Sequence, residues 1–219
     1  FQSGAALDGA TYEPELAGTR HIIARTTGRT HGAISRLIDP SALGELLKPF
    51  VFLDYFDESR ARMPPFGFHP HSGIATLTYV AQGAFRYEDT SGAVGLLEGG
   101  GVEWINAGSG VWHRAQAATH EPLHGFQLWI ALPPRLELGP ASSRYVPIGE
   151  LSVAGPARVL LGHYGGASSS IESPSSINYL SVSLRPGERW VYQPPEEHTV
   201  LWVAVSKGAV SATERIEQG

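Results

Sequence analysis

The sequence predicts an all-β fold built from many short strands. Three observations support this prediction. The 219 residues include 26 Gly and 16 Pro, which mark frequent turns. Only 17% of the residues are charged, which argues against long solvent-exposed helices and coiled coils. Runs of β-branched and aromatic residues recur between Gly-rich corners, a pattern typical of a jelly roll or a similar double sheet.

Six strands are predicted in the first 132 residues. The clearest is 74–80, Ile-Ala-Thr-Leu-Thr-Tyr-Val, which alternates and ends at a Gln-Gly turn. The others share short apolar patterns bounded by Gly, Asp and Ser, and they are 84–88, 93–97, 102–105, 111–113 and 125–132. One short helix is expected at 41–47, with Ser41 as its cap.

A second series of strands follows a segment rich in Pro, Gly and Ser. That segment, 134–156, is predicted to cross between two modules. The later strands are predicted at 157–161, 177–184, 189–192 and 200–205. The domain prediction is therefore an N-terminal barrel at 8–133 and a C-terminal barrel at 157–219. The second series has too few strands to close a barrel, so we expect residues to be missing or disordered after Gly219.

Composition excludes several functions. The absence of Cys excludes disulfide frameworks, catalytic thiols and thiolate-bound metals, so any metal must be held by His, carboxylate or water. A net charge of −5 gives no basic surface for nucleic acid. No apolar run approaches the ~20 residues that cross a bilayer, and no signal peptide is evident. We expect no membrane or nucleic-acid partner and a cytoplasmic location. Residues 1–7, which begin Phe-Gln-Ser-Gly, are interpreted as a tag remnant and a disordered start.

The sharpest motif is His69-Pro70-His71. Residues i and i+2 of a strand project from the same face, so both imidazoles can point inward. His113 follows the Gly-rich corner at 107–110, where a neighbouring strand would bring a third imidazole. Three converging imidazoles suit a divalent first-row metal. The alternative is a set of unrelated surface or loop histidines.

These residues resemble the pirin family. The resemblance is carried by five segments: 66–71 (Phe-Gly-Phe-His-Pro-His), 76–83, 87–92 (Tyr-Glu-Asp-Thr-Ser-Gly), 104–113 and 123–129 (Leu-His-Gly-Phe-Gln-Leu-Trp). It implies two stacked β-barrels of the cupin superfamily, with a metal held in the first by His69, His71 and His113. Fe(II) is the metal that the resemblance implies, with other divalent first-row metals as alternatives. A lone His198 predicts no metal in the second barrel.

The sequence departs from the family pattern at the fourth ligand. Pirins commonly carry Glu two residues after the third His, whereas Ala115 stands there in this chain. The site would lose one negative charge and gain an open coordination position. Residues close by in the sequence are candidates to compensate, none with support from a motif: Gln116, His120, Glu121, His124 and, depending on strand register, Glu103.

Two main functions are consistent with these features. The first is a mononuclear iron dioxygenase acting on a flavonol-like small aromatic, as in quercetin dioxygenases, to which some pirins are similar. Phe66, Phe68 and Trp112 flank the histidines and are the expected pocket residues. No catalytic base is assigned, because the expected Glu is absent. The second is a non-enzymatic regulatory protein that binds a metal or small ligand and contacts a protein partner, as the mammalian pirin, a nuclear transcription cofactor, does. A degenerate cupin without metal is the third alternative.

Overall fold

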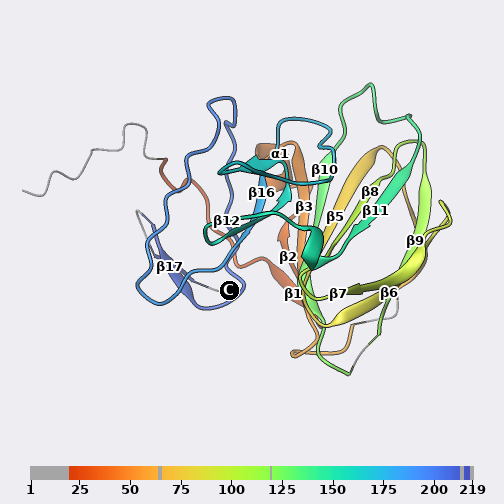
Figure 1. The fold of residues 1–219 in the computed structure, drawn as a ribbon, viewed down its shortest axis with the longest axis horizontal. Coiled ribbons are helices and arrows are strands. Elements are labelled where there is room, and N and C mark those ends of the chain that lie inside the picture. The colour runs from red at the N-terminus through yellow and green to blue at the C-terminus, as the bar shows by residue number, and fades with distance from the viewer. Residues whose placement is uncertain (1–19, 64–65, 119, 213–214, 218–219) are drawn as a thin grey trace, which may run out of the picture.

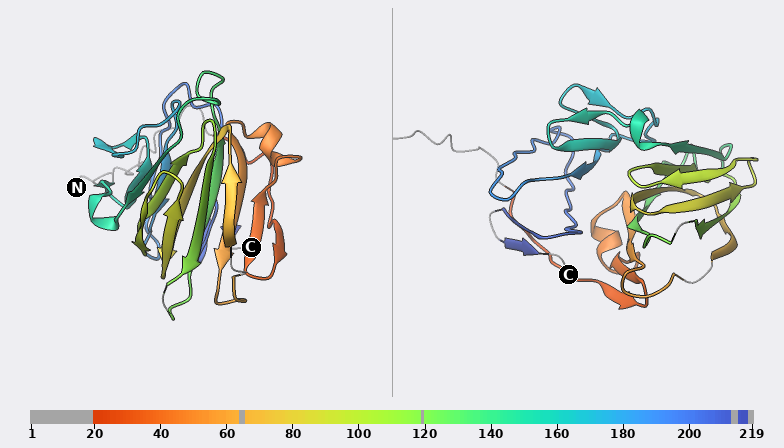
Figure 2. Two further views of the ribbon diagram at one scale, coloured as in Figure 1. Left: turned by 90° about the vertical axis from the view of Figure 1, so that its right-hand side faces the viewer. Right: turned by 60° about the horizontal axis from the view of Figure 1, so that its bottom comes forward.

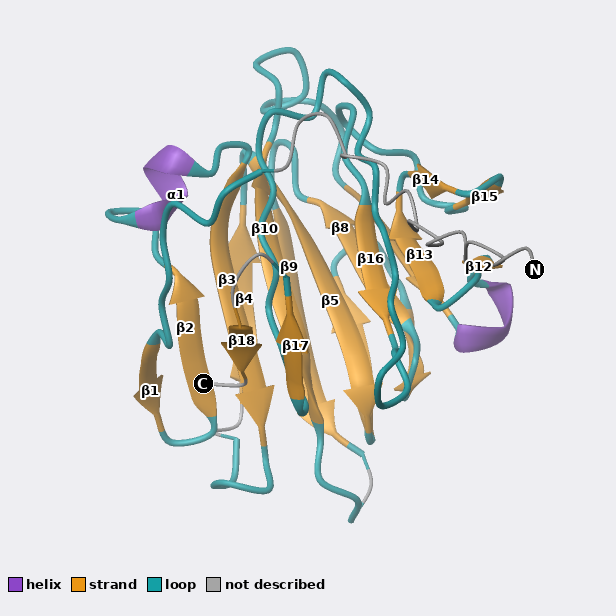
Figure 3. Cartoon of the chain, turned by 90° about the vertical axis from the view of Figure 1, so that its left-hand side faces the viewer, coloured by secondary structure: helices purple, strands orange, loops and turns teal. Residues whose placement is uncertain are grey.

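Strands make up almost all of the regular structure, which confirms the all-β prediction (Figure 3). The computed structural model describes residues 20–63, 66–118, 120–212 and 215–217, so the predicted tag remnant lies outside it. The helices of this part of the chain are α1 (Leu43–Leu46) and a short 3₁₀ helix, η1 (Ile148–Glu150). The prediction that Ser41 caps α1 is wrong. Its backbone N–H and its hydroxyl donate to Asp39 Oδ1 at 2.8 and 2.5 Å, and Ala42 holds the cap position.

Seven antiparallel strands form the large sheet, in the order β1-β2-β3-β10-β5-β8-β11. Their bounds are β1 (Arg29–His31), β2 (Ile34–Ile38), β3 (Phe50–Asp57), β5 (Ile74–Gln82), β8 (Val102–Asn106), β10 (His124–Ala131) and β11 (Ser142–Val146). The strand β11 lies inside the segment 134–156 that was predicted as a crossing, and it pairs with β8 at the edge of the sheet. The predicted domain boundaries stay a prediction.

A four-stranded sheet faces the large one, in the order β4-β9-β6-β7 (Figure 1). Its strands are β4 (Phe66–His71), β6 (Ala84–Asp89), β7 (Val94–Glu98) and β9 (Val111–Ala117). Five buried side chains, drawn from both sheets and the loop before β10, pack between them: Phe56, Val80, Phe85, Leu97 and Leu123. This is the double sheet that the Gly-rich corners predict, seen from two further sides in Figure 2.

The other face of the large sheet is also covered. Leu77 on β5 and Leu128 on β10 are fully buried there, together with Leu160 and Leu161 of β13 (Ala157–Leu161). We call this group of side chains the outer cluster. Alternation along β5 then directs Thr76 and Thr78 toward the four-stranded sheet. Because both faces are covered, these polar side chains are buried too and need partners inside the protein.

The second module has only small sheets among its described residues. Its strands are β12 (Val153–Ala154), β13 and β16 (Tyr179–Val182) in one sheet, β14 (His163–Tyr164) with β15 (Ala167–Ser168), and β17 (Ala209–Ser211) with β18 (Arg215–Glu217). None of the described helices is both long and apolar enough to cross a bilayer. The prediction of two barrels, the second of them incomplete, stays a prediction.

Two strands predicted in this module are absent. Residues 189–192 and 200–205 belong to none of the sheets that the structure describes. Their side chains still alternate, since Val200 and Trp202 pack on the outer cluster while Leu201 is 47% exposed. The prediction failed because alternation reports which side chains are buried, whereas a strand also needs a neighbouring ladder for its backbone hydrogen bonds.

Candidate metal centre

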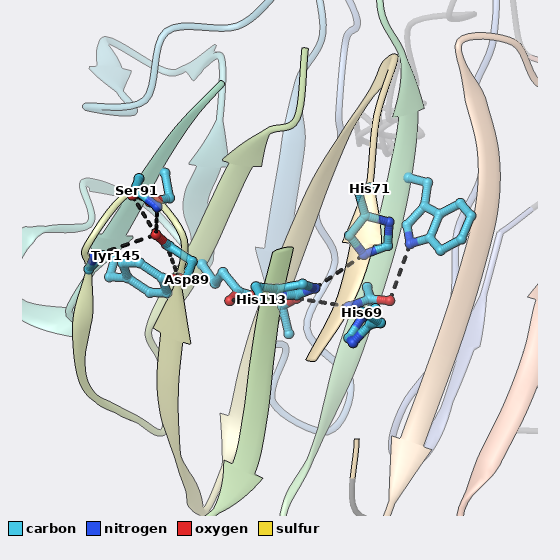
Figure 4. A network of polar contacts seen from close by, with 12 residues as sticks. His69, His71, Asp89, Ser91, His113 and Tyr145 are labelled. Carbon is cyan, nitrogen blue, oxygen red and sulfur yellow. Dashed lines mark hydrogen bonds and ion pairs between the residues drawn. The ribbon is translucent and has the colours of Figure 1, made fainter. Parts of the chain in front are cut away.

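Three histidines from two neighbouring strands converge between the facing sheets. His69 and His71 lie on β4 and His113 on β9, and the antiparallel register places His69 opposite His113. One ring nitrogen from each lies within 4.8 Å of the other two. Figure 4 shows the three rings gathered at one point. The i, i+2 spacing therefore brings the pair to one face, as the sequence predicts, and β9 adds the third ring.

The ring nitrogens are arranged as a ligand set. His71 Nε2 lies 3.1 Å from His113 Nε2. His69 Nδ1 lies 3.0 Å from the Gly67 carbonyl oxygen and can donate to it, which leaves its Nε2 lone pair for the site. A separation of about 3 Å is what two nitrogens at right angles around one ion need, with bonds of about 2.1 Å. The residues present thus fit a divalent first-row metal, and imidazole alone does not select among these metals.

Burial keeps His71 in the form that binds metal. Its side chain is 7% exposed and that of His113 only 2%, while His69 is half-buried. Burial, and then the neighbouring His113 and His69 rings, lower the pKa of His71 from 6.5 to about 4. The imidazole is therefore neutral at pH 7, as metal binding requires.

We expect the metal-free protein to lose stability as the pH falls from about 6.5 to about 4. In this window the unfolded chain binds a proton at His71 that the folded chain, with its pKa of about 4, does not bind. The free energy of unfolding should fall by up to about 1.4 kcal/mol per pH unit. Urea denaturation in chelator at pH 7, 6 and 5 measures this slope. A His71→Gln variant with an unchanged slope would contradict the assignment.

Glu103 is the site residue that the sequence left open. The register of β8 turns it inward, where it is 1% exposed. Its Oε2 accepts a hydrogen bond from Thr78 Oγ1 at 2.8 Å, and its Oε1 lies 3.5 Å from His113 Nδ1. Within the described structure, neither Oε1 nor Nδ1 has a hydrogen-bond partner. The signal that could have found it is a single carboxylate inside the apolar run Val-Glu-Trp-Ile.

A cavity of about 700 Å³ opens beside the histidines. Its wall includes His69, His113 and Ala115, so the methyl group of Ala115 stands where the family pattern has a carboxylate. The rest of the wall has an apolar part (Ile34, Phe56, Met63, Phe66, Phe85, Pro122 and Leu123) and a polar part that includes Asp54, Thr78, Glu103, Gln116 and Gln127. This is the composition of a site for a small molecule that is largely apolar and carries a few polar groups.

The three expected pocket residues are placed differently. Phe66 lines the cavity, beside a register irregularity between β4 and β9. Phe68 and Trp112 are 41% and 51% exposed and are not among the lining residues. Both alternate with the histidines and so face away from them, and the guanidinium of Arg114 lies 4.9 Å from the Phe68 ring centre.

Among the other candidates to replace the missing Glu, His120, Glu121 and His124 do not belong to the histidine cluster. Gln116 and His120 line the cavity, while Glu121 accepts a hydrogen bond from Gln82 Nε2 at 3.1 Å. His124 begins β10, opposite Asp57. Among the described residues, the three predicted histidines form the one cluster of His, Asp or Glu side chains that could hold a metal.

A second polar network fixes the turn next to His113. Asp89 lies opposite His113 in the pairing of β6 with β9 and accepts hydrogen bonds from Ser91 and from the Tyr145 hydroxyl at 2.9 Å (Figure 4). Burial raises the pKa of Asp89, but hydrogen bonds from Ser143, Ser91 and Tyr145 outweigh it and leave the pKa below its ordinary value. Asp89 is thus ionised and held by its own partners rather than offered to the three histidines.

Comparison with known proteins agrees with this geometry. The Pirin family model matches residues 30–130. Two proteins of Pseudomonas aeruginosa, both named "Putative quercetin 2,3-dioxygenase", are 34% and 30% identical to this chain. The alignments cover 72% and 84% of this chain and 60% and 69% of those relatives. A crystal structure titled quercetin 2,3-dioxygenase, from Acinetobacter baumannii, superposes with a TM-score of 0.59 at 27% identity, over 68% of this chain and 58% of that one.

The matched segment contains the whole candidate site. Residues 30–130 span β4, β9 and the cavity wall between them, so the family match and the metal geometry concern the same part of the chain. The second Pseudomonas relative extends the similarity over most of the remaining sequence. The chain belongs to the pirin family.

Proposed function

We propose that this protein is a mononuclear iron dioxygenase of the quercetin 2,3-dioxygenase type, acting on a flavonol-like small aromatic. The observation that carries the proposal is a cluster of three imidazoles opening on a cavity of about 700 Å³. The names of the Pseudomonas and Acinetobacter relatives support the reaction type. We further propose Fe(II) as the metal and the cytoplasm as the location.

Different residues of the site would hold the metal and bind the substrate. His69, His71 and His113 would hold the metal. Bound Fe(II) would supply open coordination positions and electron transfer between an aromatic hydroxyl and oxygen. The rings of Phe56 and Phe85 give the cavity an apolar wall that accepts a planar aromatic and excludes water.

Polar groups of the wall would orient the hydroxyls of the substrate. The Gln127 side chain lies in the cavity wall beside Thr78 and Glu103. Asp54, also in the wall, accepts two hydrogen bonds from the Arg36 guanidinium, at 2.9 and 3.0 Å. The aromatic substrate would therefore lie between the apolar side chains. Its hydroxyls would point toward the histidines and toward these polar side chains of the cavity wall.

Oxygen uptake by iron-loaded protein tests the enzyme proposal. We expect quercetin to stimulate oxygen consumption by the wild-type protein, and we expect His113→Ala to abolish it because that change removes one of three ligands. His124→Ala, which changes a histidine outside the cluster, is the matched control and should retain uptake. No uptake across a panel of flavonols and catechols would contradict the proposal.

A second function is favoured by one specific observation. Ala115 leaves the histidine cluster without a carboxylate ligand in the described structure. We propose as the alternative a non-enzymatic regulatory protein that binds a metal or small ligand and contacts a protein partner. Stoichiometric metal without oxygen uptake on any flavonol would favour this alternative over the dioxygenase.

A further inference from the structure

We propose that Glu103 supplies the negative charge that the site lacks at Ala115, acting through the far side of the His113 ring rather than as a ligand. The inference rests on the proposed metal binding by the three histidines. It assigns Glu103 as a positioning residue, placed on a different strand and a different sheet from the carboxylate of the family pattern.

The contact with His113 has the required direction. The His113 Nε2 faces the site, 3.1 Å from His71 Nε2, so Nδ1 is the nitrogen directed away from it. Glu103 Oε1 lies 3.5 Å from that Nδ1, and both side chains are almost completely buried. A neutral imidazole carries one proton, and a carboxylate beside Nδ1 holds the proton there. The Nε2 lone pair is then free for a metal.

A row of hydrogen bonds across three strands holds Glu103 in place. Trp129 Nε1–H donates to Gln127 Oε1 at 3.2 Å, and Gln127 Nε2–H donates to Thr78 Oγ1 at 3.4 Å. The Thr78 hydroxyl donates in turn to Glu103 Oε2 at 2.8 Å. The register places Gln127 opposite Thr78 and Thr78 opposite Glu103. Each of the three groups donates toward Glu103, so Glu103 Oε2 already accepts a hydrogen bond. Glu103 Oε1 remains for His113.

The charge of Glu103 is not neutralised elsewhere. In the described part of the chain, no Lys or Arg forms an ion pair with it, and the one basic side chain beside it is the His113 ring. Asp54, the other buried carboxylate of the cavity wall, is instead bound by two nitrogens of Arg36. A buried carboxylate without a basic partner is costly unless a positive group comes close. A metal ion held by His113 provides that group through the ring.

The test is the affinity of the purified protein for Co(II), measured by competition with a chromophoric chelator. Glu103→Gln keeps the shape of the side chain and removes its charge. We expect the affinity to fall about 10- to 100-fold, the usual effect of losing a carboxylate partner of a ligating histidine. Glu98→Gln, an equal loss of charge on the exposed edge strand β7, should change the affinity by less than about twofold.

Two further variants separate positioning from folding. Adding Ala115→Glu to the Glu103→Gln chain should restore the affinity, because it returns a carboxylate to the site. Thr78→Val keeps the carboxylate but removes the bond to Oε2, and it should cause a smaller loss. Nitrogen-15 NMR of the metal-free wild type should show His113 protonated at Nδ1.

The outcomes are distinguishable. A Glu103→Gln chain that binds Co(II) as tightly as the wild type overturns the role of Glu103 and leaves the metal site standing. A His113 protonated at Nε2 in the metal-free wild type overturns it as well. A wild-type chain that binds no Co(II) overturns the metal site and this role together.

Discussion

A chain carrying both His69→Ala and His71→Ala is expected to contain no iron, where the wild type should hold about one ion per chain. The double change removes two of the three imidazoles and leaves His113 alone on β9. One neutral imidazole is a weak site, because affinity in a histidine cluster comes from several nitrogens meeting at one ion. Mass spectrometry of metals in protein expressed with added iron measures the difference.

The control for this experiment is His124→Ala, which removes a histidine on β10 that is not part of the cluster. That variant should hold as much iron as the wild type. Equal iron in the double variant and the wild type would place the metal elsewhere. No metal in any of the three proteins would favour the degenerate, metal-free alternative.

Ala115→Glu should tighten metal binding by about tenfold or more, equal to at least about 1.4 kcal/mol. Ala115 lies two residues after His113 on β9 and lines the cavity, so a longer side chain there projects toward the same space. The cavity of about 700 Å³ has room for it. A fourth ligand that is negatively charged offsets the positive charge of the ion, which three neutral imidazoles do not. The same Co(II) competition measures the change.

Ala115→Gln is the matched comparison, because it adds the same bulk without the charge. We expect Gln to have little effect on affinity and Glu to have a large one. Equal affinities in the two variants would show that charge at this position does not govern metal retention.

The sequence predicted the histidines because their geometry is local. An i, i+2 pair on a strand shares one face whatever the rest of the fold does, and a Gly corner before His113 indicated the neighbouring strand. Glu103 could not be predicted in this way. A shift of one residue in the register of β8 would have turned it to the outer cluster, and that register is set by pairing with β5.

Nearness in sequence was a poor guide to the pocket. Phe68 and Trp112 adjoin the histidines in the chain, yet alternation sends them to the opposite face. The cavity wall comes instead from distant strands, such as Phe56 of β3 and Gln127 of β10. The strand predicted at 200–205 was wrong for the same reason. Its side chains alternate as predicted, but whether a neighbouring strand pairs with it depends on the whole fold.

Both faces of the large sheet are covered, so we expect its strands to open to solvent later than the edge strand β4. Amides of β5 and β10 have strand partners on both sides and packed side chains above and below, so we expect them to exchange with solvent only when the molecule unfolds as a whole. β4 is an edge strand with one neighbour, β9. Glu103 lies on β8, in the large sheet, which is the layer expected to exchange most slowly. His69 and His71 lie on β4, which can separate from the fold by losing its pairing with β9 alone. An ion held by histidines of both β4 and β9 would tie the two strands together. Metal binding should therefore slow the hydrogen exchange of the β4 amides.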